Sequence, residues 1–184
     1  MTRKKSIDPE RILDAAERIL SARGAHSLTL DMVAAEAGIS KGGLTYTFPT
    51  KEALLSAILD RGIARLRARL KPQRGSERAE PRSELRHWLD ICRGNSTINE
   101  VKIGAILAAL QHAPGSLKST RSYIRWMLSK FAPDTELGRR ARLVFYATQG
   151  LFLLQGFGLL TLTAAKRKLI LDDFVSFLAV RSPR

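Results

Sequence analysis

Short polar residues and lysines are concentrated between residues 29 and 51, and their types suit the binding of a phosphate-bearing ligand. A lysine ammonium group pairs with phosphate, a hydroxyl group hydrogen-bonds to it, and a small residue lets the backbone approach closely. Lys41 and Lys51 are expected to contact phosphate, and the hydroxyl of Tyr46 is suited to the same role. The full set of predicted contact residues is Thr29, Ser40, Lys41, Gly42, Gly43, Thr45, Tyr46, Thr47 and Lys51.

The sequence, by contrast, contains no set of residues suited to catalysis or to metal binding. No nucleophile has a base nearby, no pair of carboxylates shares an apolar helix face, and no glycine-rich loop is arranged to cradle phosphate. Cys92 is the single cysteine and is expected to be a small buried residue, while His26, His87 and His112 are isolated from one another. The sequence therefore predicts no enzyme, no metal site and no cofactor.

The charge balance indicates an anionic partner. The chain of 184 residues has a net charge of +14, and phosphate binding is driven largely by lysine and arginine. The excess is not confined to the segment above, because residues 1–70 carry 12 basic and 8 acidic side chains and residues 71–184 carry 19 and 9. Hydrophobic residues make up 45%, which excludes a disordered chain. The first ten residues are polar and lack an apolar signal region, so the cytoplasm is the expected location.

Helical periodicity and capping residues predict an all-α fold. Apolar residues recur at helical spacing after Asp8-Pro9, and Thr29, Ser40 and Thr50 are each placed to cap a following helix. These signals predict helices over about 9–23, 30–37, 41–47 and 51–70, and then a charged, proline-containing loop over 71–81. Further helices are expected over about 83–93, 97–112, 117–131, 135–160 and 164–180, which makes about nine in total.

The two helices on either side of Gly38 form the most specific motif in the chain. Glycine tolerates the positive φ that so abrupt a reversal needs, and Ala34 and Ala37 let the two helices cross closely. The pattern predicts a helix-turn-helix over about residues 30–49, whose second helix presents its N-terminal end to a DNA major groove. Within that second helix, Gly43 and Thr45 are expected to face the groove.

The motif resembles the DNA-binding domain of the TetR family over about residues 8–68. The matching positions are Ala34, Ala37, Gly38, Ser40, Lys41, Gly42, Leu44, Tyr46, Phe48, Lys51, Glu52 and Leu54. Two positions depart from the family pattern, since Thr45 stands where an aromatic residue is common and Thr47 where histidine is common. Thr45 is therefore expected to make a smaller contact with the DNA backbone or a base edge.

The resemblance implies a domain plan and a function. It implies an N-terminal three-helix DNA-binding domain over residues 1–70 and a C-terminal helical domain for ligand binding and dimerisation over residues 71–184. The protein is then expected to be a homodimeric repressor that binds a palindromic double-stranded DNA operator and is released by a small lipophilic effector. The alternative is a regulator of the same type that senses no small molecule, and that answers to a protein partner or acts constitutively.

In TetR-like proteins the C-terminal domain holds the ligand pocket, and its last two helices pair with a second copy. The candidate pocket residues are large side chains of the middle helices: Trp88, Ile91, Cys92, Leu107, Leu110, Trp126, Phe131, Phe145, Tyr146 and Gln149. The candidate dimer contacts are Ala147, Gly150, Leu154, Phe157, Leu169, Phe174 and Phe177.

A stretch of 23 positions from Leu143 to Ala165 contains no charged residue and is long enough to span a bilayer. Two glutamines, three threonines, three glycines and a helix break near Thr161 argue against a membrane helix. A helix that is apolar on all sides is also required where it is buried against both its own core and a partner copy. We therefore expect a dimer helix here and no membrane partner.

Overall fold

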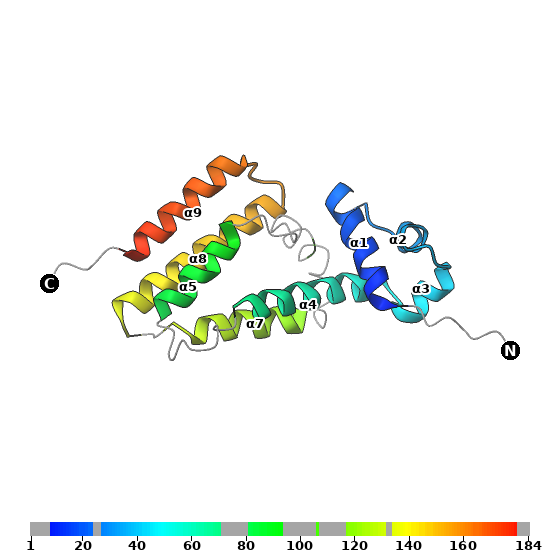
Figure 1. Cartoon of the computed structure of the whole chain (residues 1–184), viewed down its shortest axis with the longest axis horizontal. Helices are drawn as coiled ribbons and strands as arrows, with labels where there is room; N and C mark the ends of the chain where they lie inside the picture. The colour runs from blue at the N-terminus through cyan, green and yellow to red at the C-terminus, as the bar shows by residue number, and fades with distance from the viewer. Residues whose placement is uncertain are drawn as a thin grey trace.

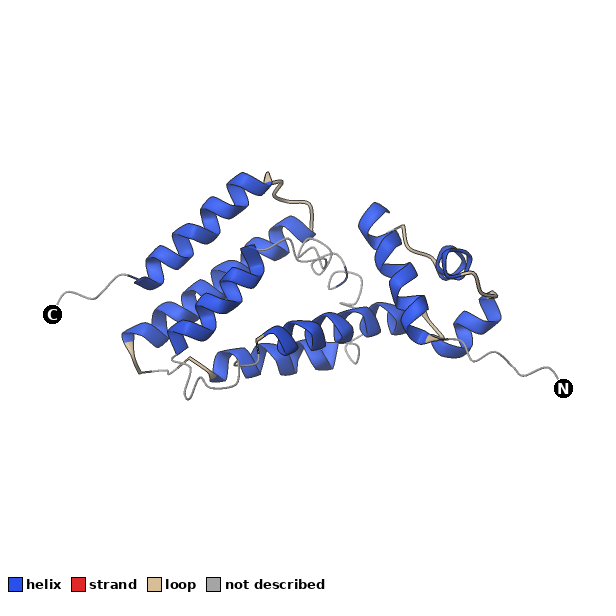
Figure 2. Ribbon diagram, in the orientation of Figure 1, coloured by secondary structure: helices blue, strands red, loops and turns tan. Residues whose placement is uncertain are grey.

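The computed structural model describes residues 8–23, 27–70, 81–93, 106, 117–131 and 134–179. All the regular structure in these segments is helical, as Figure 2 shows, and this confirms the all-α prediction for them. The arrangement is elongated: α1, α2 and α3 gather at one end, α4 runs away from them, and α5, α8 and α9 lie towards the other end (Figure 1).

The four N-terminal helices begin where the sequence predicts capping residues. α1 (Pro9–Arg23) follows Asp8, whose carboxylate accepts a hydrogen bond from the backbone N–H of Glu10 at 3.0 Å. α2 (Leu30–Ala37), α3 (Lys41–Thr47) and α4 (Lys51–Arg69) follow Thr29, Ser40 and Thr50, and each hydroxyl oxygen accepts from the N–H three residues further on. A cap of this kind stabilises a helix by about 1 kcal/mol, so these side chains fix where the short helices start.

Gly38 makes the reversal between α2 and α3. Its φ of 66° and ψ of 38° lie in the left-handed region, and its N–H bonds to the carbonyl groups of Ala34 and Ala35. Side chains with a β-carbon rarely adopt this conformation, so glycine is required at this position. The turn confirms the predicted helix-turn-helix.

α4 is shared between two hydrophobic clusters. Its first half packs into a cluster with α1, α2 and α3, which we call the head cluster, through Leu54, Leu55, Ile58 and Leu59. Its second half packs against a cluster of the C-terminal helices, which we call the body cluster, through Ile63, Leu66 and Leu70. With 19 residues, α4 is about 28 Å long, so it joins the two ends of the molecule as one rod.

The body cluster is built from α5 (Pro81–Arg93), α7 (Lys118–Ser129), α8 (Glu136–Gly156) and α9 (Ala164–Ala179). α8 is capped by Thr135 and ends four residues before its predicted boundary. α9 follows after a loop and is capped by Thr163, whose hydroxyl accepts from the N–H of Lys166 at 3.2 Å. The helix predicted over 97–112 lies outside the described residues except for Ile106, which is helical.

The uncharged stretch is therefore divided between α8 and α9 by the loop at residues 157–163. Among the described helices, none has the length and apolar character needed to cross a membrane.

Candidate nucleic-acid interface

α3 is a short helix that is anchored from one side and open on the other. Leu44 is fully buried in the head cluster, whereas the ring of Tyr46 is 92% exposed. Lys41 and Gly42, in the first turn, are also exposed. The fold thus holds α3 as a ridge with its N-terminal end free, and this is the geometry that a major-groove helix needs.

The predicted hydroxyl contacts already have hydrogen bonds within the chain. Thr29 and Ser40 accept N–H groups as helix caps, so each retains its hydroxyl proton for an external acceptor such as phosphate. Thr45 Oγ1 donates to the carbonyl oxygens of Lys41 and Gly42 at 3.0 and 3.2 Å, and Thr47 Oγ1 donates to Gly43 at 3.3 Å. Because those protons are committed, the oxygens of Thr45 and Thr47 face a ligand as acceptors.

The two predicted phosphate-binding lysines lie at the starts of α3 and α4. Lys41 pairs with Asp31 at 3.0 Å, but both side chains are well exposed, and such a pair is worth no more than about 1 kcal/mol. Lys51 is half-buried in the first turn of α4. Beside it, backbone and Thr50 hydrogen bonds to the carboxylate hold the pKa of Glu52 below its ordinary value.

Gly42 has no role in the packing of the isolated chain. A β-carbon built at this position meets no atom within 4 Å, and no positive φ requires glycine there. Alanine favours a helix by up to about 1 kcal/mol over glycine, so the internal structure gives no reason for this residue. A close approach from outside, such as a DNA backbone, does give one.

Two arginine contacts that the sequence did not predict, one hydrogen bond and one ion pair, join α1 to α2. Arg11 donates to the carbonyl oxygen of Ala37 at the C-terminal end of α2, at 3.2 Å, and Arg18 pairs with Glu36 at 2.7 Å. A cation at a helix C-terminus is favoured by the helix dipole. Arginine is common on solvent-exposed helix faces, so the sequence alone does not distinguish Arg11 and Arg18 from other arginines. Their contacts become apparent only where α1 crosses α2.

The predicted pocket residues fall into three groups. Trp88, Ile91, Cys92, Phe131 and Phe145 are buried in the C-terminal domain. Trp126 and Gln149 are half-buried, Tyr146 is exposed, and Leu107 and Leu110 lie outside the described residues. The buried aromatic rings are in contact, with centroid distances of 5.3 Å for Trp88–Phe145 and 6.0 Å for Phe131–Phe145.

Tyr123, which is not among the predicted pocket residues, joins this aromatic group. Its hydroxyl accepts a hydrogen bond from Nε1 of Trp88 at 3.0 Å, and both side chains are buried. Burial raises the pKa of Tyr123 well above its ordinary value, so the hydroxyl stays protonated. The signal available in the sequence was its place one helical turn before Met127, which is also buried.

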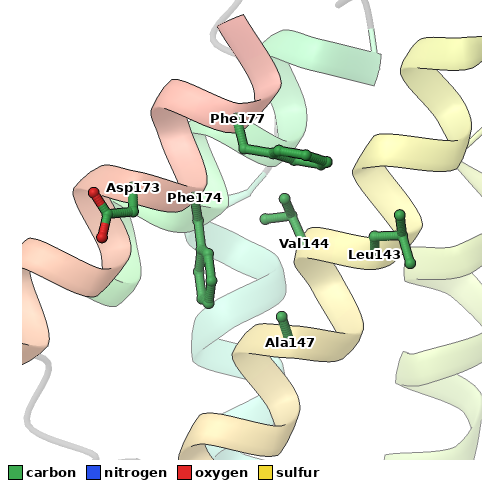
Figure 3. A pocket seen from close by; sticks show the side chains of 6 residues that line it. All are labelled: Leu143, Val144, Ala147, Asp173, Phe174 and Phe177. Carbon is green, nitrogen blue, oxygen red and sulfur yellow. The ribbon is translucent and has the colours of Figure 1, made fainter. Parts of the chain in front are cut away.

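An exposed apolar face runs along α8 and α9. Seven large apolar side chains between residues 143 and 177 are at least 45% exposed: Leu143, Tyr146, Leu154, Phe157, Leu159, Leu169 and Phe177. A groove of about 360 Å³ opens on this face between the two helices, and it is lined by Leu143, Val144, Ala147, Asp173, Phe174 and Phe177 (Figure 3).

The predicted dimer contacts lie on or beside this face. Ala147, Leu154, Phe157, Leu169 and Phe177 are exposed, whereas Gly150 and Phe174 are half-buried. None of the predicted pocket residues lines the groove. The face and the aromatic core are therefore separate features of the C-terminal domain.

Two family models match the chain in succession. Residues 12–58 match the model described as bacterial regulatory proteins, tetR family, and residues 82–179 match the tetracyclin repressor-like C-terminal domain. An uncharacterized HTH-type transcriptional regulator in the dhlA 5′ region of Xanthobacter autotrophicus is 31% identical over 140 residues. That match covers 71% of this chain and 68% of the relative.

Solved structures of similar shape cover nearly the whole chain. A transcriptional regulator from Rhodococcus sp. RHA1 superposes with a TM-score of 0.71 at 20% identity, covering 93% of this chain and 95% of that one, which shows similarity of fold. The multidrug binding protein EbrR, complexed with malachite green, superposes with a TM-score of 0.63 at 26% identity and covers 95% of this chain and 98% of that one.

Proposed function

The chain belongs to the tetR family of bacterial regulatory proteins, and from that membership we propose that it is a homodimeric repressor released from a palindromic operator by a small lipophilic effector. It is a DNA-binding transcriptional regulator and not an enzyme. Because transcription takes place where the DNA lies, the cytoplasm is its proposed location.

The free end of α3 carries the DNA-binding part of the proposal. Lys41 and Lys51 supply charge for phosphates, Gly42 leaves room for a backbone, and Thr45 offers an acceptor to the edge of a base. A threonine oxygen that acts as acceptor suits the amino groups of adenine or cytosine in the major groove. One α3 helix covers too few base pairs for useful specificity, so two copies are needed.

The apolar face of α8 and α9 supports a dimer. Along α8, one stripe contains Leu143, Ala147, Gly150, Leu154 and Phe157, with alternating spacings of four and three residues. This is the spacing of helices that pair along a common seam, and two helices from each copy would form a four-helix bundle. An exposed apolar patch of this extent is otherwise unfavourable in water.

The aromatic core supports control by an effector because it is coupled to the DNA-binding helices through α4. The guanidinium of Arg67 lies 5.3 Å from the centre of the Trp126 ring, and the end of α4 packs in the body cluster. Ile106 and Leu117 pack against the head cluster, so they provide a second connection between the C-terminal helices and the DNA-binding helices. A ligand that separates α5, α7 and α8 would move both contacts. That EbrR has been crystallised with malachite green makes a lipophilic effector the first class to test.

One observation favours the second candidate, a tetR-type regulator without a small-molecule effector. Trp88 and Phe145 are at most 1% exposed, and ring contacts and a hydrogen bond fill the space between them and Tyr123. An effector would have to displace these contacts. A protein partner or constitutive binding requires no such opening.

Selection of bound fragments from random DNA tests the DNA-binding proposal. We expect a palindromic consensus bound by a dimer, with the mass confirmed by light scattering. Lys51→Ala should weaken binding to all sequences and lower the salt slope by about one charge, whereas Thr45→Ala should change which half-sites are preferred. Binding that is unaffected by either change would place the reading surface elsewhere.

A panel of lipophilic compounds separates the two candidates. A true effector should raise the melting temperature and release the selected operator at the same concentrations. If no compound does either, while operator binding is intact, the regulator without a small-molecule effector is the better description.

A further inference from the structure

Arg61 lies where α4 passes from one hydrophobic cluster to the other. Leu59 is the last α4 residue in the buried part of the head cluster, and Ile63 is the first that packs against the body cluster. Gly62 follows Arg61 directly, and glycine inside a helix costs about 1 kcal/mol relative to alanine. Gly62 therefore lowers the helical stability of the connecting rod close to the point where the two clusters meet.

The side chain of Arg61 is only 8% exposed and is held by three carboxylates of α1. Nη1 donates to Glu10 at 2.9 Å and to Asp14 at 2.8 Å, and Nε donates to Glu17 at 3.1 Å. Glu10, Asp14 and Glu17 are four and three residues apart, so they occupy successive turns on one face of α1. A single guanidinium thus contacts successive turns of α1, and it adds to the apolar packing that holds α1 against α4.

The guanidinium of Arg61 stays positively charged in this environment. Burial acts to lower its pKa, but the hydrogen bonds that the guanidinium donates to the three carboxylates outweigh burial, and the pKa is raised. Arg65 adds a longer contact with Glu17, at 3.3 Å, from the more exposed side of α4. A planar fork with several donors is suited to this geometry in a way that a lysine ammonium is not.

We propose that Arg61 is a positioning residue that sets the angle of the DNA-binding helices relative to the second half of α4, and thereby the half-site spacing that the dimer accepts. The inference rests on the proposed function, because spacing has meaning only for a dimer with two α3 helices. One added base pair shifts a half-site by about 3.4 Å and turns it by about 35° around the DNA axis. Arg61 and Arg65, on either side of Gly62, both contact Glu17, so α1 is tied to α4 across this glycine. A dimer held in this way cannot follow that change, whereas a dimer in which α1 is free to shift along α4 can.

We expect the domain to fold without the guanidinium. The side chains of Glu10, Asp14 and Glu17 are 64%, 53% and 25% exposed, so they stay hydrated without their partner. The apolar residues of α1 remain packed in the head cluster. The role of Arg61 is therefore separable from the stability of the fold.

Three operators test the proposal: the selected palindrome, and versions with one base pair added to or removed from its centre. We compare wild type, Arg61→Met, Arg61→Lys and Arg18→Met. Arg18 is the matched control, since it also joins α1 to a carboxylate, but its partner is Glu36 of α2 instead of a residue of α4. Both methionine variants lose one positive charge. Any loss of DNA affinity that comes from net charge alone should therefore occur in both variants.

We expect wild type and Arg18→Met to prefer the native spacing by about ten-fold or more, which is the scale of one mismatched base pair. Arg61→Met should prefer it by about three-fold or less, and Arg61→Lys should lie between, because one ammonium group cannot reach three carboxylates in the same way. Circular dichroism confirms that each variant is folded.

A uniform loss of affinity for all three operators, with the wild-type ratio retained in Arg61→Met, overturns the positioning role and leaves Arg61 as a structural ion pair. Absence of specific binding by the wild type, in contrast, is a failure of the proposed function. A second measurement needs no DNA: spin labels at the exposed positions Ala35 and Ala68 should give a broader distance distribution in Arg61→Met than in wild type or Arg18→Met. Equal widths in all three also overturn the proposal.

Discussion

At the scale of single residues, the candidate interface on α3 has exposed side chains and open space that make few contacts within the chain. Lys41 has only an exposed ion pair with Asp31, and Tyr46 is almost fully exposed. Gly42 has open space where a side chain would be. Gly42 is unfavourable for the isolated helix, and the exposed Lys41 and Tyr46 side chains are accessible from outside, so all three fit the proposed approach of DNA to α3.

Gly42→Ala should therefore change stability and binding in opposite directions. Alanine fits without contact and favours the helix, so the free energy of unfolding should rise by up to about 1 kcal/mol. The added methyl group lies in open space, where the proposed function places DNA, so operator affinity should fall. Urea unfolding and fluorescence anisotropy measure the two effects. Unchanged affinity would mean that the DNA backbone does not come close at Gly42.

At the scale of elements, α5, α7 and α8 are held together by aromatic contacts and one buried polar pair. The Trp88 N–H has its acceptor in Tyr123, which comes from a different helix. Arg93 adds an ion pair from α5 to Asp172 of α9. The packing of the body cluster therefore depends on specific partners as well as on apolar area.

Tyr123→Phe should lower the free energy of unfolding by about 1–3 kcal/mol, because the buried N–H of Trp88 loses its acceptor while the ring is kept. Tyr146→Phe is the control, since Tyr146 is exposed, and it should change stability by less than about 0.5 kcal/mol. Urea titration followed by circular dichroism makes the comparison. Equal effects of the two changes would contradict the importance of the pair.

The raised pKa of Tyr123 also predicts a dependence on alkaline pH. A group whose pKa is higher in the folded state adds stability below its unfolded value, about 10 for tyrosine, and loses that contribution as the pH rises further. Wild type should therefore lose stability above about pH 10 more steeply than Tyr123→Phe. Parallel pH profiles of the two proteins would show that burial of Tyr123 does not control this loss.

At the scale of the whole molecule, one rod and one apolar face are expected to determine the geometry of the dimer. α4 connects the two hydrophobic clusters, and α8 and α3 lie towards opposite ends of the molecule (Figure 1). In the proposed dimer, a change of packing in the C-terminal domain is transmitted to the spacing of the two α3 helices through α4.

Gly150→Leu tests the dimer at a position that the single chain does not need. A β-carbon at Gly150 meets no atom within 4 Å, so the fold of one chain should tolerate the change. Two closely packed helices should not, at a cost of about 1–3 kcal/mol or more per contact. Light scattering should show monomer, and operator binding should be lost, whereas Ala64→Leu on the exposed side of α4 should leave both unchanged. A Gly150→Leu variant that remains a dimer would place the interface elsewhere.

The sequence by itself determined the local structure of the DNA-binding end. Thr29, Ser40 and Thr50 cap helices through bonds to residues three positions away, and Gly38 turns the chain through its own backbone angle. Such interactions depend on neighbours in the sequence, so they can be predicted from it. The dimer helix was expected from the uncharged stretch of residues 143–165 and from the family resemblance, and its exposed stripe became apparent only in the structure.

The tertiary structure alone decided which distant residues meet. Arg61 is 44 or more residues from each of its three carboxylates, and Trp88 is 35 residues from Tyr123. In the sequence Arg61 is one of several arginines on a charged helix, and Tyr123 is an ordinary aromatic residue of another. Arg61 is removed from water only where α1 crosses α4, and the Trp88–Tyr123 pair only where α5 and α7 meet. Burial gives each contact its strength, and burial depends on the packing of the helices and not on the spacing of residues along one of them.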